Sequence, residues 1–166
     1  MSPKNKAEKR KAKLKARKQQ IAFNEQSLSA RLSCALEKLC EPIMPEYIDD
    51  SKGPDLVGRW IVWRMGQIAW NIVVTGRRES VSEAFQHTQL NAEQQETVRN
   101  EIIGLIKRKI SDFPTQRTAI RDFSVLLVSG VPRVKVRPGD TFPKIPFPEF
   151  SEPESEPKAV SDVTPD

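Results

Sequence analysis

Apolar residues recur at helical spacing in three segments of the chain. The first segment, from Leu28 to Leu39, places five apolar residues on one face of a helix that should end before Pro42. Residues 42–54 contain three prolines and one glycine, and they predict a connector.

Residues 55–75 are the most apolar segment, and they predict one long central helix. Trp60, Trp63 and Trp70 follow helical spacing, and Gly76 is placed to cap the C-terminus. A buried strand is the alternative for residues 72–75. Tryptophans at such spacing in a small domain are expected in the core rather than in a ligand-stacking set.

The clearest helix is predicted for residues 92–112. Asn91 and Gln94 have the spacing of a capping box. The apolar face that follows consists of Val98, Ile102, Leu105, Ile106, Ile110 and Phe113. A shorter helix is predicted for residues 81–88. These two predicted helices do not favour a DNA-binding helix-turn-helix. Glu93 and Glu96 lie at the start of the second helix, where their carboxylates would repel the DNA phosphates.

Beyond Pro114 the pattern changes towards strands. Residues 123–128 (FSVLLV) favour a strand, Ser129–Gly130 indicates a turn, and basic residues alternate strictly with valines over 133–137. A helical turn over 116–122 remains open. The predicted fold class is therefore mainly α: a small domain of three to four helices with a candidate C-terminal β-hairpin.

Charge is sorted along the chain. Residues 1–20 carry a net charge of +8, residues 140–166 a net charge of −5, and the stretch between them is nearly neutral. This predicts a basic tail (1–20) that is disordered or transiently helical, a helical body (21–139) and an acidic, Pro-rich, disordered tail (140–166). The acidic tail could compete with phosphates for the basic tail, or it could dock a partner through its phenylalanines.

The basic tail is the main candidate binding site. Its cations are Lys4, Lys6, Lys9, Arg10, Lys11, Lys13, Lys15, Arg17 and Lys18. Such a cluster can displace counterions from a phosphate chain, and it contains no aromatic residue on which bases could stack. We therefore expect backbone-directed contact with RNA, DNA or a ribonucleoprotein, with low sequence specificity. The alternative is a tail that only aids solubility.

A secondary basic surface is a weaker candidate. It consists of Arg117, Arg121, Arg133, Lys135 and Arg137. The last three would line one face of a strand, and the first two would lie one turn apart on a helix. The alternative is ordinary edge protection of a sheet by cations.

Catalytic and metal-binding chemistry is not indicated. Cys34 and Cys40 are six residues apart, which puts them on different faces of a helix, so we expect free thiols. His87 is the single histidine. Asp49 and Asp50 lie in the connector, where solvated carboxylates are usual. No phosphate-binding glycine loop or nucleophile elbow occurs. We expect no enzyme, cofactor or metal, and, without a signal peptide or a membrane span, a cytoplasmic protein.

Two functions are consistent with these patterns. In the first, the basic tail binds nucleic acid and the body positions it. In the second, the body is a protein–protein adaptor and both tails only aid solubility. Under the second, the apolar faces of residues 28–39 and 98–113 exceed what one core can cover, and the chain self-associates or binds a partner.

Overall fold

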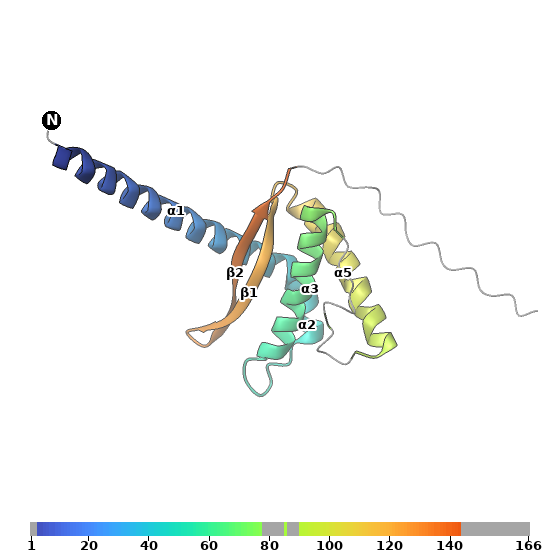
Figure 1. The fold of residues 1–166 in the computed structure, drawn as a ribbon. Coiled ribbons are helices and arrows are strands. Elements are labelled where there is room, and N and C mark those ends of the chain that lie inside the picture. Colours follow the sequence, from blue (N-terminus) through green and yellow to red (C-terminus); the bar gives the residue numbers. More distant parts are fainter. Residues whose placement is uncertain (1–2, 78–84, 86–89, 144–166) are drawn as a thin grey trace, which may run out of the picture.

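The computed structural model describes residues 3–77, 85 and 90–143, with side chains from Arg10 onward (Figure 1). The described elements are α1 (Pro3–Cys40), a 3-10 turn (Glu41–Ile43), α2 (Met44–Tyr47), α3 (Leu56–Thr75), α5 (Ala92–Asp112), β1 (Thr118–Val128) and β2 (Val131–Thr141). A mainly helical fold with a C-terminal hairpin is thus confirmed. The helix predicted for 81–88 lies outside the described residues, apart from the buried Phe85.

Helix α3 forms where the sequence predicts the central helix. Asp55 caps its N-terminus, because the Asp55 side chain accepts a hydrogen bond of 2.8 Å from the N–H of Gly58. Gly76 ends the helix in the left-handed conformation, with φ of 69°, and donates its N–H to Ile72 O at 2.9 Å. The helical prediction is therefore confirmed at both ends.

Helix α5 begins with the predicted capping box. Asn91 accepts a hydrogen bond from the N–H of Gln94 at 2.8 Å, and the Gln94 side chain accepts from the N–H of Asn91 at 3.0 Å. Its apolar face is buried against α3 between Val98 and Ile106. At its end the prediction was wrong, since Ile110 is 40% exposed and Lys109 is buried instead.

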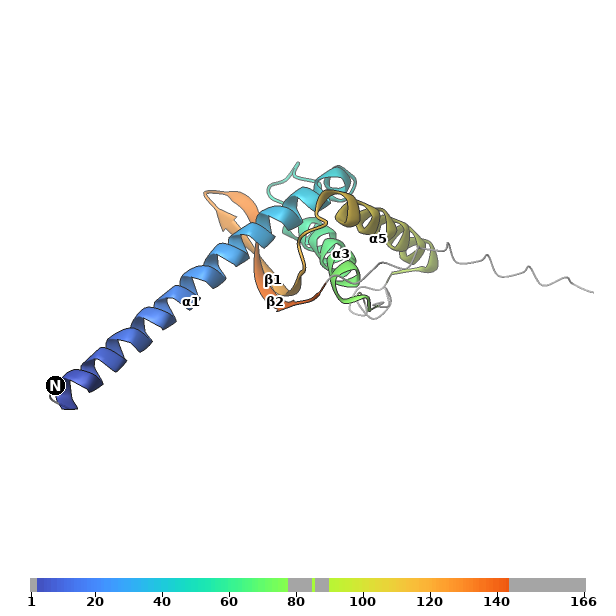
Figure 2. The same cartoon turned by 90° about the horizontal axis from the view of Figure 1, so that it is seen from above.

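Helix α1 is one continuous helix in two environments. Its C-terminal part packs on α3 and on the hairpin, with Leu32, Leu36 and Leu39 buried. Its N-terminal part extends away from the body in both views (Figures 1 and 2), and every residue from Arg10 to Ser27 is exposed. Within the predicted basic tail (1–20), the backbone is therefore helical from Pro3 onward. That this tail is disordered or only transiently helical stays a prediction.

Strands β1 and β2 pair antiparallel around a two-residue turn. Val128 lies opposite Val131, and Ser129 and Gly130 both have positive φ, 52° and 79°. Such values suit a two-residue hairpin turn. The hairpin is longer than the predicted one, because residues 118–122 belong to β1 and β2 continues to Thr141.

The core lies where α3 is covered by α5 on one side and by the hairpin on the other (Figure 1). Trp63 and Trp70 are buried in it, as predicted. The indole N–H of Trp70 donates to Thr118 O at 2.9 Å and so ties α3 to the start of β1. Trp60 departs from the prediction, because 41% of it is exposed beside β1.

Candidate nucleic-acid interface

The basic segment of α1 (residues 10–18) carries cations on the part of the helix that leaves the body. The described cations are Arg10, Lys11, Lys13, Lys15, Arg17 and Lys18, all of them exposed. None of them makes an ion pair within the described residues. Lys4, Lys6 and Lys9 belong to α1 by their backbone, but their side chains are outside the described part.

The helical repeat spreads these cations around α1. Steps of three and four residues place the six cations on two adjacent rows, because an α-helix has about 3.6 residues per turn. Ala12 and Ala16 occupy the third side, and Leu14, 57% exposed, lies between the rows. A helix charged on two sides can meet phosphates on both walls of a groove.

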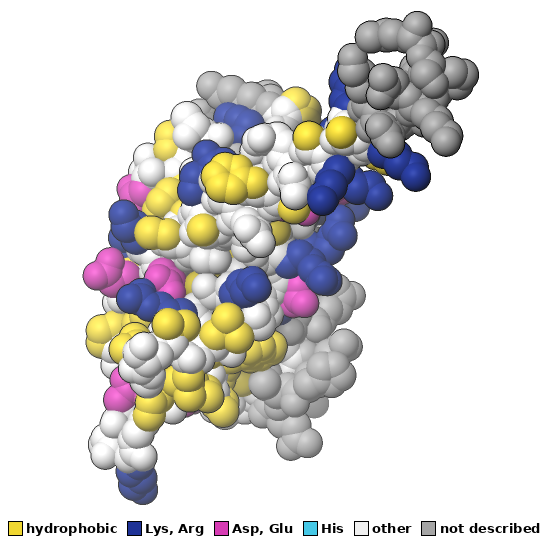
Figure 3. All heavy atoms as spheres, turned by 90° about the vertical axis from the view of Figure 1, so that its left-hand side faces the viewer, with side chains coloured by type: hydrophobic (Ala, Val, Ile, Leu, Met, Phe, Trp, Pro, Cys, Tyr) yellow, Lys and Arg dark blue, Asp and Glu magenta, His cyan; other side chains and the backbone are white. Residues whose placement is uncertain are grey.

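A second basic surface lies on the outer face of β2. Arg133, Lys135 and Arg137 are exposed and alternate with two buried valines, as the sequence predicts for one face of a strand. Arg133 Nη1 lies 3.2 Å from Glu37 Oε2 on α1, so one of these cations already has a counter-charge. Figure 3 shows Lys and Arg side chains in a band from the projecting helix across this face of the molecule.

A stretch of helix without cations separates the two basic surfaces. Between Lys18 and Ser29, where α1 first bonds to β2, the chain contains one acid, Glu25, and no cation. Eleven residues of helix span about 17 Å. The sequence pattern predicted each basic surface but could not give this separation, because it depends on α1 continuing as a helix into the body.

Arg117 and Arg121 do not extend the basic surface of β2. The helical arrangement that would place them one turn apart is not present, because this part of the chain enters strand β1. Arg117 is half-buried and donates to Pro114 O at 3.2 Å. Arg121 is exposed at the irregular register between Ile120 and Asp122.

The connector carboxylates act as structural acceptors. Asp50 accepts two hydrogen bonds from the Arg59 guanidinium, at 2.6 and 2.7 Å, and these bonds lower the pKa of Asp50 to about 2. Asp50 also accepts the N–H of Asp55 at 2.8 Å. In the described part of the chain no group of three or more His, Cys, Asp or Glu could hold a metal.

The two cysteines are free and differ in accessibility. Cys34 is exposed on α1, whereas Cys40 is buried against α3. Burial raises the pKa of the Cys40 thiol to about 12, so this sulfur stays protonated and unreactive.

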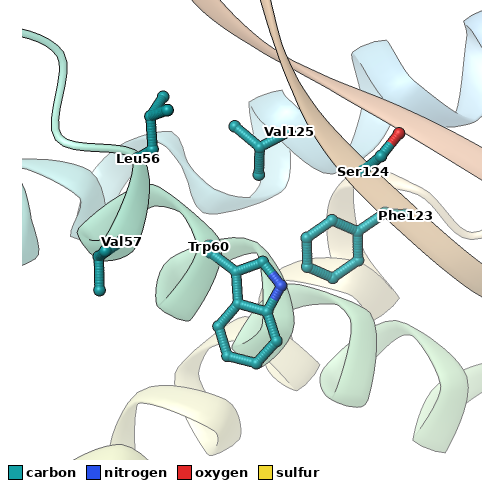
Figure 4. Close-up of a pocket in the computed structure, with 6 residues that line it drawn as sticks. All are labelled: Leu56, Val57, Trp60, Phe123, Ser124 and Val125. Carbon is teal, nitrogen blue, oxygen red and sulfur yellow. The ribbon is translucent and has the colours of Figure 1, made fainter.

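The structure has an apolar groove between α3 and β1 that the sequence patterns did not predict. It has a volume of about 570 Å³ and is lined by Leu56, Val57, Trp60, Phe123, Ser124 and Val125 (Figure 4). The rings of Trp60 and Phe123 lie 6.2 Å apart between centroids. The sequence feature that could have indicated this groove is the run FSVLLV, which is more apolar than a hairpin with one buried face requires.

Comparison of the chain with protein-family models, curated proteins and solved structures found no match. Among the described helices, none is both long and apolar enough to cross a membrane.

Proposed function

We propose that this protein binds nucleic acid, free or within a ribonucleoprotein, through phosphate contacts made by the basic segment of α1. The observation that carries the proposal is the set of six exposed cations without ion-pair partners among the described residues, on a helix that projects from the body. Counterion release from a phosphate chain gives such a cluster its affinity.

The chemistry of the segment suits backbone contact rather than base reading. Residues 10–18 contain no aromatic side chain for stacking and no Asn or Gln for base edges. Phosphate contacts position a protein without carrying sequence information. Low sequence specificity follows. An α-helix fits the major groove of duplex DNA, and basic helices can also enter irregular RNA grooves.

The basic face of β2 offers a second contact for the same ligand. Duplex DNA has a charge every 3.4 Å or so on each strand, so a gap of about 17 Å corresponds to roughly five base pairs. A duplex could therefore reach both surfaces, although Glu37 already neutralises part of the second one. We assign most of the affinity to α1.

Matched variants test this assignment. The first is Arg10→Gln, Lys13→Gln and Arg17→Gln, which removes one row of α1; the second is Arg133→Gln, Lys135→Gln and Arg137→Gln, which removes the same residue types from β2. Gln retains a high helix propensity. Binding of labelled duplex DNA and of an RNA hairpin is measured by fluorescence anisotropy across salt concentrations.

With six cations engaged on duplex DNA, log K falls against log salt with a slope of about −5. The α1 variant is expected to reduce this slope by about 3, and a chain beginning at Ile21 should lose most of it. The β2 variant should retain most of the affinity. Equal losses in the two variants, or no binding by the intact chain near physiological salt, would contradict the proposal.

A protein–protein adaptor is the second candidate function. The exposed groove between α3 and β1 favours it, since contiguous apolar surface marks interaction sites. Under this alternative, polyanions do not bind the intact chain and a partner protein binds equally to the chain that begins at Ile21.

A further inference from the structure

Side chains of α1 cover the outer edge of β2. The N–H of Val136 donates to Ser33 Oγ at 2.9 Å, and the N–H of Val134 donates to Glu37 Oε1 at 3.2 Å. Ser29 Oγ donates to Val136 O. The three α1 residues are four apart and share one face of the helix. This edge is therefore not open to another strand.

Side chains of α3 cover the first half of β1 in the same way. Asn71 accepts the N–H of Ile120 at 2.8 Å and donates to Ile120 O at 2.9 Å. Gln67 donates to Ile120 O at 3.1 Å. Beyond residue 121 these contacts end, because α3 and the hairpin diverge towards the hairpin turn (Figure 1).

The second half of β1 presents an uncovered edge. Val128 and Val131 flank the two-residue turn and form a hydrogen-bonded pair. By the alternation of antiparallel pairing, Phe123, Val125 and Leu127 turn their N–H and C=O groups away from β2. The N–H of Phe123 donates to Asp122 Oδ1. Within the described residues, Val125 and Leu127 have no partner on this edge.

The uncovered edge adjoins the apolar groove. Leu127 is 55% exposed, and Val57 at the start of α3 is 71% exposed. Natural sheets usually protect an open edge with Lys, Pro or a bulge, but residues 123–128 contain no charged residue and no proline. An occupant should therefore be an extended, uncharged, apolar segment that can both pair with the edge and fill the groove.

We propose that this edge is a self-association surface on which a second copy of the chain pairs its own β1 antiparallel. A two-fold axis at Val125 places each Val125 opposite the other and Phe123 opposite Leu127 of the second copy. Residues that pair directly point to one face of the sheet. Leu127 of each copy then fills the groove of the other, beside Trp60.

Charge favours a second copy over the acidic C-terminal segment. The groove has no charged lining residue, and β1 is uncharged from Phe123 to Val128, whereas residues 144–166 carry six acids. The cations on β2 do not oppose pairing, because two intervening strands hold them about 14 Å apart, beyond the Debye length of about 8 Å at physiological salt.

The reach of the chain also disfavours its own C-terminal segment as the occupant. The N–H of Phe142 donates to Arg117 O at the end of the hairpin opposite its turn. About 23 Å of β1 separates Thr118, at this end, from Val125 beside the groove. Phe147 lies four residues beyond Pro143 and can extend at most about 14 Å. Phe147 therefore cannot reach the groove of the same molecule. Phe150, the next large apolar residue, has Glu149 beside it and Glu152 two residues on, which suits an uncharged groove poorly.

Analytical ultracentrifugation of the full chain over a wide range of concentration tests the proposal. The wild type should form a dimer, and Leu127→Lys should raise its dissociation constant by at least about tenfold because two leucines lose their burial. Leu14→Lys is the matched control, since Leu14 and Leu127 are 57% and 55% exposed. It should leave the dimer unchanged.

Disulfide trapping tests the register. In a Cys34→Ser background, Val125→Cys should cross-link on mild oxidation, because residues in such a pair have Cα atoms about 5.5 Å apart. Arg133→Cys should not cross-link. A monomer at every concentration, equal effects of the two Lys substitutions, or a dimer lost only when residues 144–166 are deleted would each overturn the proposal.

Discussion

The buried ammonium of Lys109 completes the C-terminal end of α5. Its Nζ donates to Phe113 O at 2.6 Å and to Gln116 O at 2.9 Å, and it lies 4.3 Å from the centroid of the Trp70 ring. These carbonyls follow the last turn, where a helix leaves acceptors unpaired. Removal from water lowers the pKa of Lys109 to about 8, and the charge of Arg117 adds to this effect.

This pKa predicts how stability depends on pH. Between about pH 8 and 10.5 the unfolded chain holds a proton on Lys109 that the folded chain has lost, so this residue makes stability rise with pH. The unfolding free energy of the wild type, minus that of Lys109→Met, should increase by about 2 kcal/mol from about pH 7 to 9.5. Chemical denaturation measures it. A flat difference would show that Lys109 keeps its ordinary pKa in the folded chain, and a falling one that folding raises this pKa; either result would contradict the prediction.

The position of Lys109 could have been derived from the sequence, but its burial could not. Ile102, Ile106, Lys109 and Phe113 are spaced by four, three and four residues, which places Lys109 on the buried face. The rule that lysine prefers solvent gives the opposite result. Here the two carbonyls and the Trp70 ring reverse that preference, and no local pattern shows that they meet.

At the scale of elements, α1 and α3 approach each other at Gly66. A Cβ at this position would overlap Cys40 Sγ and stand 2.9 Å from Leu36 Cδ1. Glycine inside a helix is unfavourable, so the close packing of α1 explains its presence here. Gly104 in α5 offers a contrast, because a Cβ there would meet nothing within 4 Å.

These two glycines give a matched prediction. Gly66→Ala should lower the unfolding free energy by about 1–3 kcal/mol, because the added methyl forces α1 and α3 apart. Gly104→Ala should raise it by about 0.5–1 kcal/mol through helix propensity. Thermal and urea denaturation of both variants provide the measurement. A stabilised Gly66→Ala protein would mean that α1 does not pack on α3 as described.

Local patterns predicted the elements better than their extent. Periodicity and caps located α3 and α5, and alternation located the exposed face of β2. The start of β1 was not predictable, because Thr118–Arg121 is held by α3 side chains such as Asn71. The candidate basic segment was found by composition alone, whereas the groove at Trp60 required knowledge of how α3 and β1 diverge.

At the scale of the whole molecule, the basic segment of α1 (residues 10–18) contributes no residue to the hydrophobic core. Residues 10–27 are exposed and belong to a helix that leaves the body. A chain that begins at Ile21 should therefore keep its cooperative unfolding, with a free energy within about 0.5 kcal/mol of the intact chain. Loss of cooperativity would show that the segment supports the fold, and the truncated chain would then be unsuitable for the binding test.

The bonding of α1 to β2 has a consequence for synthesis on the ribosome. Ser33 and Val136 are 103 positions apart in the chain, so α1 cannot form this hydrogen bond until β2 has been synthesised. Until then Leu32, Leu36 and Leu39 lack part of their cover. Contacts between such distant positions slow folding and leave apolar surface open to chaperones. A ribosome stalled before Val131 should therefore carry a nascent chain that is still sensitive to protease.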